Sequence, residues 1–181
     1  PPSIEAAKSG VTTGEWGQVM RDVFGVYKAP TGVGKSISND VSNLDHLRLA
    51  VDEVSDRLGR RMKLLVGKPG LDGHSNGAEQ IATRARDCGI EITYEGIRLT
   101  PNEIVDAAIL ENVHVIGLSI LSGSHTPLVK DVLKRLKDKD RQDIPVVVGG
   151  IIPEKDAIDL KKAGVSQVYT PKDFELNKII A

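Results

Sequence analysis

Several residue types are scarce in this chain of 181 residues, and each scarcity excludes a class of protein. There is one cysteine, Cys88, so no disulfide can form within the chain, and a reducing cytoplasm is the expected location. Aromatic residues make up 3% and the formal net charge is −1 without a basic cluster, which argues against nucleic-acid binding. No apolar run approaches the length of a membrane span, and no signal peptide opens the chain. We therefore expect a cytoplasmic protein with neither a nucleic-acid nor a membrane partner.

The first third of the chain lacks the regular alternation of strands and helices that the rest has. We predict that residues 1–60 form an irregular linker or tail, and that residues 61–181 form a domain. The first segment contains, in order, a short helix at 1–8, an amphipathic helix capped by Thr13, a linker at 28–43 and a helix at 45–59. The amphipathic helix has no partner helices of its own, so it should pack on the second part or on a missing domain. Since the chain begins with Pro1 rather than Met, we expect it to be a piece of a longer polypeptide.

The predicted linker contains a segment that resembles a phosphate-binding loop. Ala29–Ser36 ends in Gly-Lys-Ser, but Ala29 stands where the phosphate-binding loop requires its first glycine. The residues that follow are also a poor helix start. We therefore do not predict nucleotide binding at this segment.

From Met62 onward, apolar runs alternate with helix-like runs. The expected strands are Met62–Gly67, Ile90–Glu95, Val113–Ile120, Pro145–Gly149 and Gln167–Tyr169. The expected helices are Ala78–Cys88, Pro101–Glu111, Pro127–Asp138, Pro153–Ala163 and Asp173–Ile180. This alternation predicts an α/β fold, a flavodoxin- or Rossmann-like doubly wound five-stranded parallel sheet with helices on both faces. With the strand order 2-1-3-4-5, a ligand should bind beyond the carboxyl ends of the strands, near the first and third.

The loop after the first predicted strand, Lys68–Gly77, is long and glycine-rich and carries both an aspartate and a histidine. Asp72 stands two residues before His74, so its carboxylate can accept the Nδ1–H of the imidazole and leave Nε2 free. That arrangement prepares a histidine to bind a metal. Glycines in the loop would let the backbone approach a bulky group.

Two other loops at the same predicted edge of the sheet have unusual residues. The third strand ends with Ser119 and the fourth with Gly149-Gly150. A small hydroxyl and two glycines predict a slot that a flat heterocycle can enter. The alternative for Gly149-Gly150 alone is a tight turn before a helix, but all three loops share the same character.

These motifs together resemble the cobalamin-binding domain that takes its cofactor base-off and histidine-on. Asp72-x-His74-x-x-Gly77, Ser119-x-Leu121 and Gly149-Gly150 fall in the family's order and spacing, over residues 61–181. The resemblance implies that His74 replaces the cofactor's dimethylbenzimidazole as cobalt ligand, with Asp72 and then Lys68 behind it. The candidate cofactor-binding residues are Asp72, Gly73, His74, Ser75, Asn76, Gly77, Ser119, Leu121, Ser122, Gly123, Gly149, Gly150 and Ile151.

Within that family, the chain is most similar to acyl-CoA mutases of the methylmalonyl-CoA mutase family, and among these to the ethylmalonyl-CoA mutases. The segments that carry this likeness are Lys68–His74, Leu99–Pro101, Ser119–His125, Gly149–Pro153 and Tyr169–Asn177. The resemblance implies an adenosylcobalamin-dependent isomerase that rearranges an acyl-CoA by radical chemistry in the cytoplasm, as a homodimer.

Residues 15–27 resemble the tail of that family's substrate-binding barrel region, so the resemblance implies that residues 1–60 are a linker or tail from it. The barrel itself is absent, which implies that the chain holds no catalytic residue and is inactive alone. A different mutase substrate remains an alternative, and so does a cobalamin carrier or sensor module. A third alternative is a flavodoxin-like domain that has lost its ligand.

The other histidines give weaker signals. We expect His114 to be a hydrogen-bonded core residue and His46 to be solvated. His125 could face the corrin edge or cap a helix, and the sequence does not choose between these. No group of four Cys, His and carboxylate residues has the spacing of a zinc site.

Overall fold

The computed structural model describes residues 2–25, 44–173 and 179–180. The chain divides into two compact units, Pro1–Pro30 and Thr31–Ala181. The linker predicted at 28–43, with its candidate phosphate-binding loop, lies outside the described residues. So does most of the last predicted helix, because 174–178 are not described.

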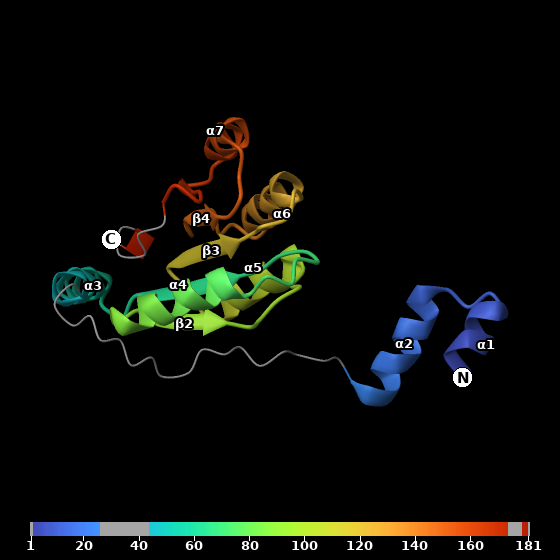
Figure 1. Ribbon diagram of the computed structural model, residues 1–181. Helices are drawn as coiled ribbons and strands as arrows, with labels where there is room; N and C mark the ends of the chain where they lie inside the picture. Colours follow the sequence, from blue (N-terminus) through green and yellow to red (C-terminus); the bar gives the residue numbers. More distant parts are fainter. Residues whose placement is uncertain (1, 26–43, 174–178, 181) are drawn as a thin grey trace. The chain divides into compact units, whose positions relative to one another are not determined.

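The second unit is built on a five-stranded sheet in which every strand pair is parallel (Figure 1). The strands are β1 (Lys63–Gly67), β2 (Glu91–Tyr94), β3 (Val115–Ser119), β4 (Val146–Gly149) and β5 (Gln167–Tyr169). Their order is β2-β1-β3-β4-β5, so the predicted fold class and strand order are confirmed. Strands β2 and β3 lie on opposite sides of β1, so the direction in which strands are added to the sheet reverses there. This reversal creates a topological switch point beyond the carboxyl ends of β1 and β3.

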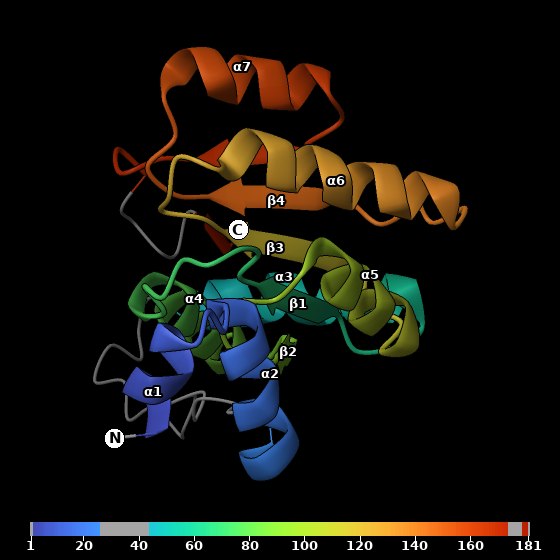
Figure 2. The same cartoon turned by 90° about the vertical axis from the view of Figure 1, so that its right-hand side faces the viewer.

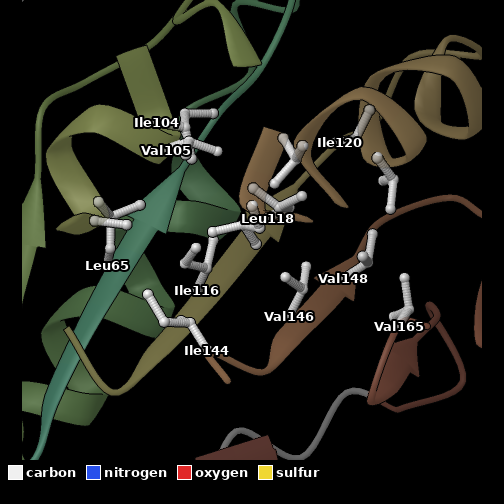
Figure 3. Close-up of a cluster of buried hydrophobic side chains, with 14 of the residues drawn as sticks. Leu65, Ile104, Val105, Ile116, Leu118, Ile120, Ile144, Val146, Val148 and Val165 are labelled. Atoms are coloured by element: carbon white, nitrogen blue, oxygen red, sulfur yellow. The ribbon is translucent and has the colours of Figure 1, made fainter. Parts of the chain in front are cut away.

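The larger hydrophobic core lies between one face of the sheet and three helices (Figures 1 and 2). These helices are α5 (Pro101–Leu110), α6 (His125–Asp138) and α7 (Glu154–Lys162). Figure 3 shows Ile116 and Leu118 of β3 beside Val146 and Val148 of β4 in this core, with Ile104 of α5. Side chains alternate between faces along a strand, so the residues between these four face the other side of the sheet.

The opposite face of the sheet is covered at one end by α3 (Asp45–Leu58) and α4 (Asn76–Asp87). Leu47 and Val51 of α3 pack with Ala78 and Ala82 of α4 in a second core cluster, which includes Leu64 of β1. Helix α3 lies within the first 60 residues, yet it contributes buried side chains to the second unit.

Helix boundaries follow capping chemistry more closely than the apolar pattern alone. Pro101 begins α5 as predicted, and Thr100 caps it in a reciprocal capping box with Glu103. Helix α6 begins at His125, two residues before the predicted start at Pro127. A proline is tolerated inside the first turn, because the backbone N–H it removes has no partner within the helix.

The first unit consists of two short helices, α1 (Pro2–Lys8) and α2 (Thr13–Phe24). The predicted cap at Thr13 is wrong by one residue: Thr12 caps α2, because only Thr12 has a glutamate three residues later, Glu15, to complete the capping box. The indole N–H of Trp16 donates to the hydroxyl of Ser3 at 3.1 Å and joins the two helices.

Candidate functional site

The loop between β1 and α4 carries the predicted histidine, and the β2–α5 loop supports it. Leu99 donates its N–H to the carbonyl of Lys68 at 3.0 Å, and Gly70 donates to the carbonyl of Leu99 at 2.9 Å. Gly70 has a φ of 83°, and a Cβ added there would lie 2.8 Å from Cδ1 of Leu128. A residue with a Cβ would be strained at this φ and would displace the Leu128 side chain, so glycine is favoured at this position.

Asp72 and His74 make the contact expected from their spacing. Asp72 Oδ1 lies 2.7 Å from Nδ1 of His74 and also accepts the backbone N–H of His74 at 3.0 Å. The imidazole is 78% exposed, whereas the carboxylate is 4% exposed. An ionised carboxylate can only accept, so Nδ1 carries the hydrogen and Nε2 keeps its lone pair. The site thus presents one basic nitrogen at the surface on a buried support.

The same aspartate ties the loop to the end of β3. Its Oδ2 accepts the N–H of Leu121 at 2.9 Å and lies 3.5 Å from Nζ of Lys68. Lys68 is fully buried and donates to the carbonyl of Ser119 at 3.1 Å. Lys68 and Asp72 therefore hold the imidazole in a fixed position relative to Ser119 and Leu121.

The contacts of Asp72 with His74, Leu121 and Lys68 keep its carboxylate charged. Burial by itself would raise the pKa of Asp72, but hydrogen bonds from His74 and Leu121, with the charge of Lys68, lower it well below the usual range. Burial lowers the pKa of Lys68, and the nearby Asp72 offsets part of that effect. At neutral pH the carboxylate is thus an acceptor, which fixes the imidazole tautomer.

A cavity of 440 Å³ lies on the face of the sheet opposite the larger core. Alternate residues of β3 and β4, among them Gly117 and Gly149, form its floor, and α4 contributes Gly77 and Ile81 to its wall. Tyr169 and the residues after it line another side. The volume lies within the range of small-molecule and cofactor sites, about 300–1,000 Å³.

Two adjacent glycines at the end of β4 keep this cavity open in different ways. A Cβ added to Gly149 would meet nothing within 4 Å, so Gly149 leaves empty space above the floor. A Cβ added to Gly150 would lie 1.8 Å from the carbonyl oxygen of Ile120. Gly150 therefore permits close approach of two backbone segments, and Gly149 permits entry of a ligand.

The structure divides the predicted cofactor-binding residues into two neighbouring groups. Those that line the cavity are Gly77, Ser119, Leu121, Gly149, Gly150 and Ile151. Those outside its lining are Asp72, Gly73, His74, Ser75 and Asn76 at the β1–α4 connection, and Ser122 and Gly123 after β3. The hydrogen bonds of Asp72 join the two groups.

Sequence reasoning missed part of the cavity floor. Gly117 stands in the middle of β3, faces the cavity and pairs in register with Val147. A lone glycine inside a strand often marks the close approach of a ligand, so this signal was present in the sequence. Val115 and Val147 gave no such signal, because the sequence pattern of a strand valine that faces the cavity is the same as that of one that faces the packed core.

His125 lies at the start of α6 without a side-chain cap there, and its place at the corrin edge stays a prediction. Its ring is 6% exposed, with Nε2 at 2.9 Å from Asp156 Oδ2 on α7 and Nδ1 at 3.4 Å from the carbonyl of Ser122. It therefore links the loop after β3 to α7. His114 is hydrogen-bonded as predicted, because its Nδ1 accepts the N–H of Lys63 at 2.9 Å. It is half-buried just before β3, however, and is not a core residue as expected.

Among residues 2–25, 44–173 and 179–180, no three His, Cys, Asp or Glu side chains gather closely enough to form a metal site. In the same ranges, no helix has the length and apolarity needed to cross a membrane.

Comparison with known proteins agrees with the geometry. The family model of the B12 binding domain matches residues 62–172. The chain is 62% identical over 180 residues to the ethylmalonyl-CoA mutase of Cereibacter sphaeroides, with 99% of this chain and 28% of that protein covered. It is 58% identical to the ethylmalonyl-CoA mutase of Methylorubrum extorquens, over 99% of this chain and 26% of that protein.

More distant similarity is found to a methylmalonyl-CoA mutase and to a solved structure. The large subunit of methylmalonyl-CoA mutase from Propionibacterium freudenreichii is 36% identical over 93% of this chain and 24% of that protein. Among solved structures, a cobalamin-binding protein from Desulfitobacterium hafniense shares the fold with a TM-score of 0.58 and 20% identity, covering 92% of this chain and 74% of that one. The chain spans 28% or less of each of these mutases, but the B12 model covers most of the chain. The chain belongs to the family of B12-binding domains.

Proposed function

We propose that this chain is the cofactor-holding part of an adenosylcobalamin-dependent mutase that converts ethylmalonyl-CoA to methylsuccinyl-CoA, with His74 as the lower cobalt ligand. The observation that carries the proposal is the exposed His74, held through Nδ1 by the buried Asp72, beside a glycine-lined cavity. When bound, adenosylcobalamin supplies the cobalt–carbon bond whose cleavage starts radical rearrangements.

The residues present fit this cofactor at both of its ends. A corrin ring already gives cobalt four nitrogen ligands, so the protein has to supply only one, and Nε2 of His74 is available for that. A displaced benzimidazole tail is flat and largely apolar. The cavity between the sheet and α4 is lined mainly by apolar side chains and glycines, and Ser119 is one of its polar lining residues.

Each protein group has a defined task in this proposal. Asp72 orients the imidazole and makes Nε2 the basic nitrogen. Lys68 keeps Asp72 ionised and couples it to Ser119, which belongs to the wall of the tail cavity. Binding of the tail and ligation of the metal thus rely on one hydrogen-bonded unit, so a shift at either end displaces the other.

The choice of substrate depends on similarity. Identity to two ethylmalonyl-CoA mutases is 62% and 58%, against 36% to the methylmalonyl-CoA mutase, which favours the ethylmalonyl-CoA branch. A methylmalonyl-CoA-type or other acyl-CoA mutase is the first alternative. A carrier or sensor module is the second, and it is supported only by fold likeness at 20% identity.

The partners of the chain follow from the same proposal. The relatives are more than three times as long as this chain, which leaves room for a substrate-binding barrel in the same protein. We expect that barrel to bind the acyl-CoA and to supply the catalytic residues, so that this chain alone does not turn over substrate. The homodimer and the cytoplasmic location implied by the resemblance stay predictions.

A visible-absorption titration with hydroxocobalamin tests the proposal directly. The wild-type chain should convert the cofactor to a base-off, histidine-ligated species, because His74 displaces the benzimidazole. His74→Ala should abolish that spectrum, while leaving the melting temperature of the free protein unchanged, since the ring is exposed.

The matched control is His46→Ala, which removes another exposed histidine, on α3. It should titrate like the wild type. A wild-type spectrum that remains that of free cobalamin would overturn the proposal. So would a histidine-ligated spectrum that survives in His74→Ala.

A further inference from the structure

Arg98 has an unusual backbone conformation next to the cobalt-ligand loop. It lies in the connection between β2 and α5 and has a φ of 64°, in the left-handed region that residues other than glycine and asparagine rarely adopt. A long side chain at such a position costs the fold free energy that a glycine would not. Strained residues of this kind concentrate at ligand-binding sites.

The neighbours of Arg98 fix its position relative to the histidine loop. Leu99 makes a parallel bridge with Pro69, donating to the carbonyl of Lys68 and accepting from Gly70. The two loops therefore form one short extension of the sheet. The backbone of Arg98 is therefore anchored beside the loop that carries His74.

The guanidinium of Arg98 reaches over that loop without a partner. A Cβ added to Gly73, the residue between Asp72 and His74, would lie 3.9 Å from Nη2 of Arg98. Within the described ranges, no hydrogen bond or ion pair is made by this guanidinium, and the residue is exposed. Asp72 is not its partner, because both carboxylate oxygens already accept from His74, Leu121 and Lys68.

We propose that Arg98 is a cofactor-binding residue that donates hydrogen bonds to amide carbonyl oxygens on the rim of the corrin ring. This inference rests on the proposed function. The corrin ring carries acetamide and propionamide arms, whose carbonyls are good acceptors for a guanidinium. Arginine suits this task because its planar fork presents several N–H donors at once.

The assignment adds a third point of attachment to those already described. His74 would hold the metal, the cavity would hold the tail, and Arg98 would hold the rim of the ring. The left-handed backbone at Arg98 is then the conformation from which the guanidinium reaches Gly73.

The test is a set of titrations of the whole chain with hydroxocobalamin and with aquocobinamide, which has the ring and its amide arms but no nucleotide tail. Arg98→Gln should weaken binding of both ligands about tenfold, the value of one charge-assisted hydrogen bond. Arg98→Lys should fall between Arg98→Gln and the wild type, because the charge stays and the fork is lost. Arg57→Gln, at an exposed arginine on α3, is the matched control and should bind normally.

Arg98→Gly separates a binding role from a turn role. Glycine relieves the backbone strain and removes the donors, so the inference requires weaker binding at unchanged or higher melting temperature. Affinity within twofold of the wild type in Arg98→Gly and Arg98→Gln would overturn the inference while the His74 result stands. A loss for cobalamin but not for cobinamide would also overturn it, since the contact would then be with the nucleotide tail. Failure of the wild type to bind either ligand would overturn the proposed function itself.

Discussion

At the scale of single residues, Gly149 and Gly150 are adjacent in the chain but have opposite surroundings. Gly149 faces the cavity with open space above its Cα, whereas Gly150 faces the backbone of Ile120. The same substitution at the two positions therefore separates ligand space from backbone packing.

Gly149→Ala should leave the unfolding free energy of the free protein unchanged and lower its affinity for hydroxocobalamin by tenfold or more. The added methyl group meets no protein atom within 4 Å but occupies part of the cavity that we propose for the benzimidazole tail. Gly150→Ala should instead destabilise the free protein by about 2–4 kcal/mol, because its Cβ overlaps a carbonyl oxygen that belongs to the core backbone. Urea denaturation and the spectral titration measure the two effects. Equal stability losses in both variants would contradict this description of the cavity.

Asp72 gives a pH-dependent contribution to stability whose sign follows from its environment. Its pKa in the folded protein is lowered from the ordinary value of 3.8, so its stabilising effect is complete above that value and is lost as the pH falls below it. Between pH 5 and 8, Asp72→Asn should cost about 1–3 kcal/mol of unfolding free energy, the worth of hydrogen bonds to a buried charged group.

That difference between wild type and Asp72→Asn should shrink steadily below about pH 4 in urea titrations at a series of pH values. The control is Asp138→Asn, whose partner Lys134 is an exposed neighbour on the same helix. It should change stability by less than about 0.5 kcal/mol throughout. A gap for Asp72→Asn that stays constant down to pH 2 would rule out an ionised, stabilising carboxylate.

At the scale of elements, α3 shows that the composition of neighbouring residues does not reveal whether a helix packs in the core. It follows a Gly- and Ser-rich stretch within the first 60 residues, yet it buries Leu47 and Val51. Leu47 is 2% exposed and packs in the cluster that contains α4 and β1. The helix thus closes one end of the sheet face on which the cavity lies.

Leu47→Ala should destabilise the second unit by about 2–4 kcal/mol, because it removes buried methyl groups from a packed cluster. Leu49→Ala on the same helix is the matched control: Leu49 is 69% exposed, so its loss should change stability by no more than about 0.5 kcal/mol. Thermal or urea unfolding of the whole chain gives both numbers. Equal effects of the two variants would show that α3 does not belong to this core.

At the scale of the whole molecule, the two units differ in how much they bury. The described helices of the first unit contain no buried residue, and Val23 and Phe24 of α2 are 67% and 76% exposed. The second unit has two continuous cores on either side of one sheet. Among the described residues, the buried side chains that stabilise the fold therefore lie in the second unit.

The sequence by itself determined the order of strands and helices, because each β–α pair repeats its own pattern and parallel crossovers have one hand. It also determined the pairing of Asp72 with His74, since two residues of separation suffice for that contact. Because the carboxyl ends of parallel strands meet at one edge of the sheet, the sequence also predicted that Ser119 and Gly149 lie near the loop Lys68–Gly77.

Only the tertiary structure decided contacts between distant segments. The burial of Lys68 against Ser119, the link from His125 to Asp156 and the approach of Arg98 to Gly73 join residues whose separation in the chain carries no pattern. The same holds for Gly117, which becomes a cavity floor only because the helices leave that part of the sheet open. Periodicity shows which face a residue is on, but what covers that face depends on the packing of the complete fold.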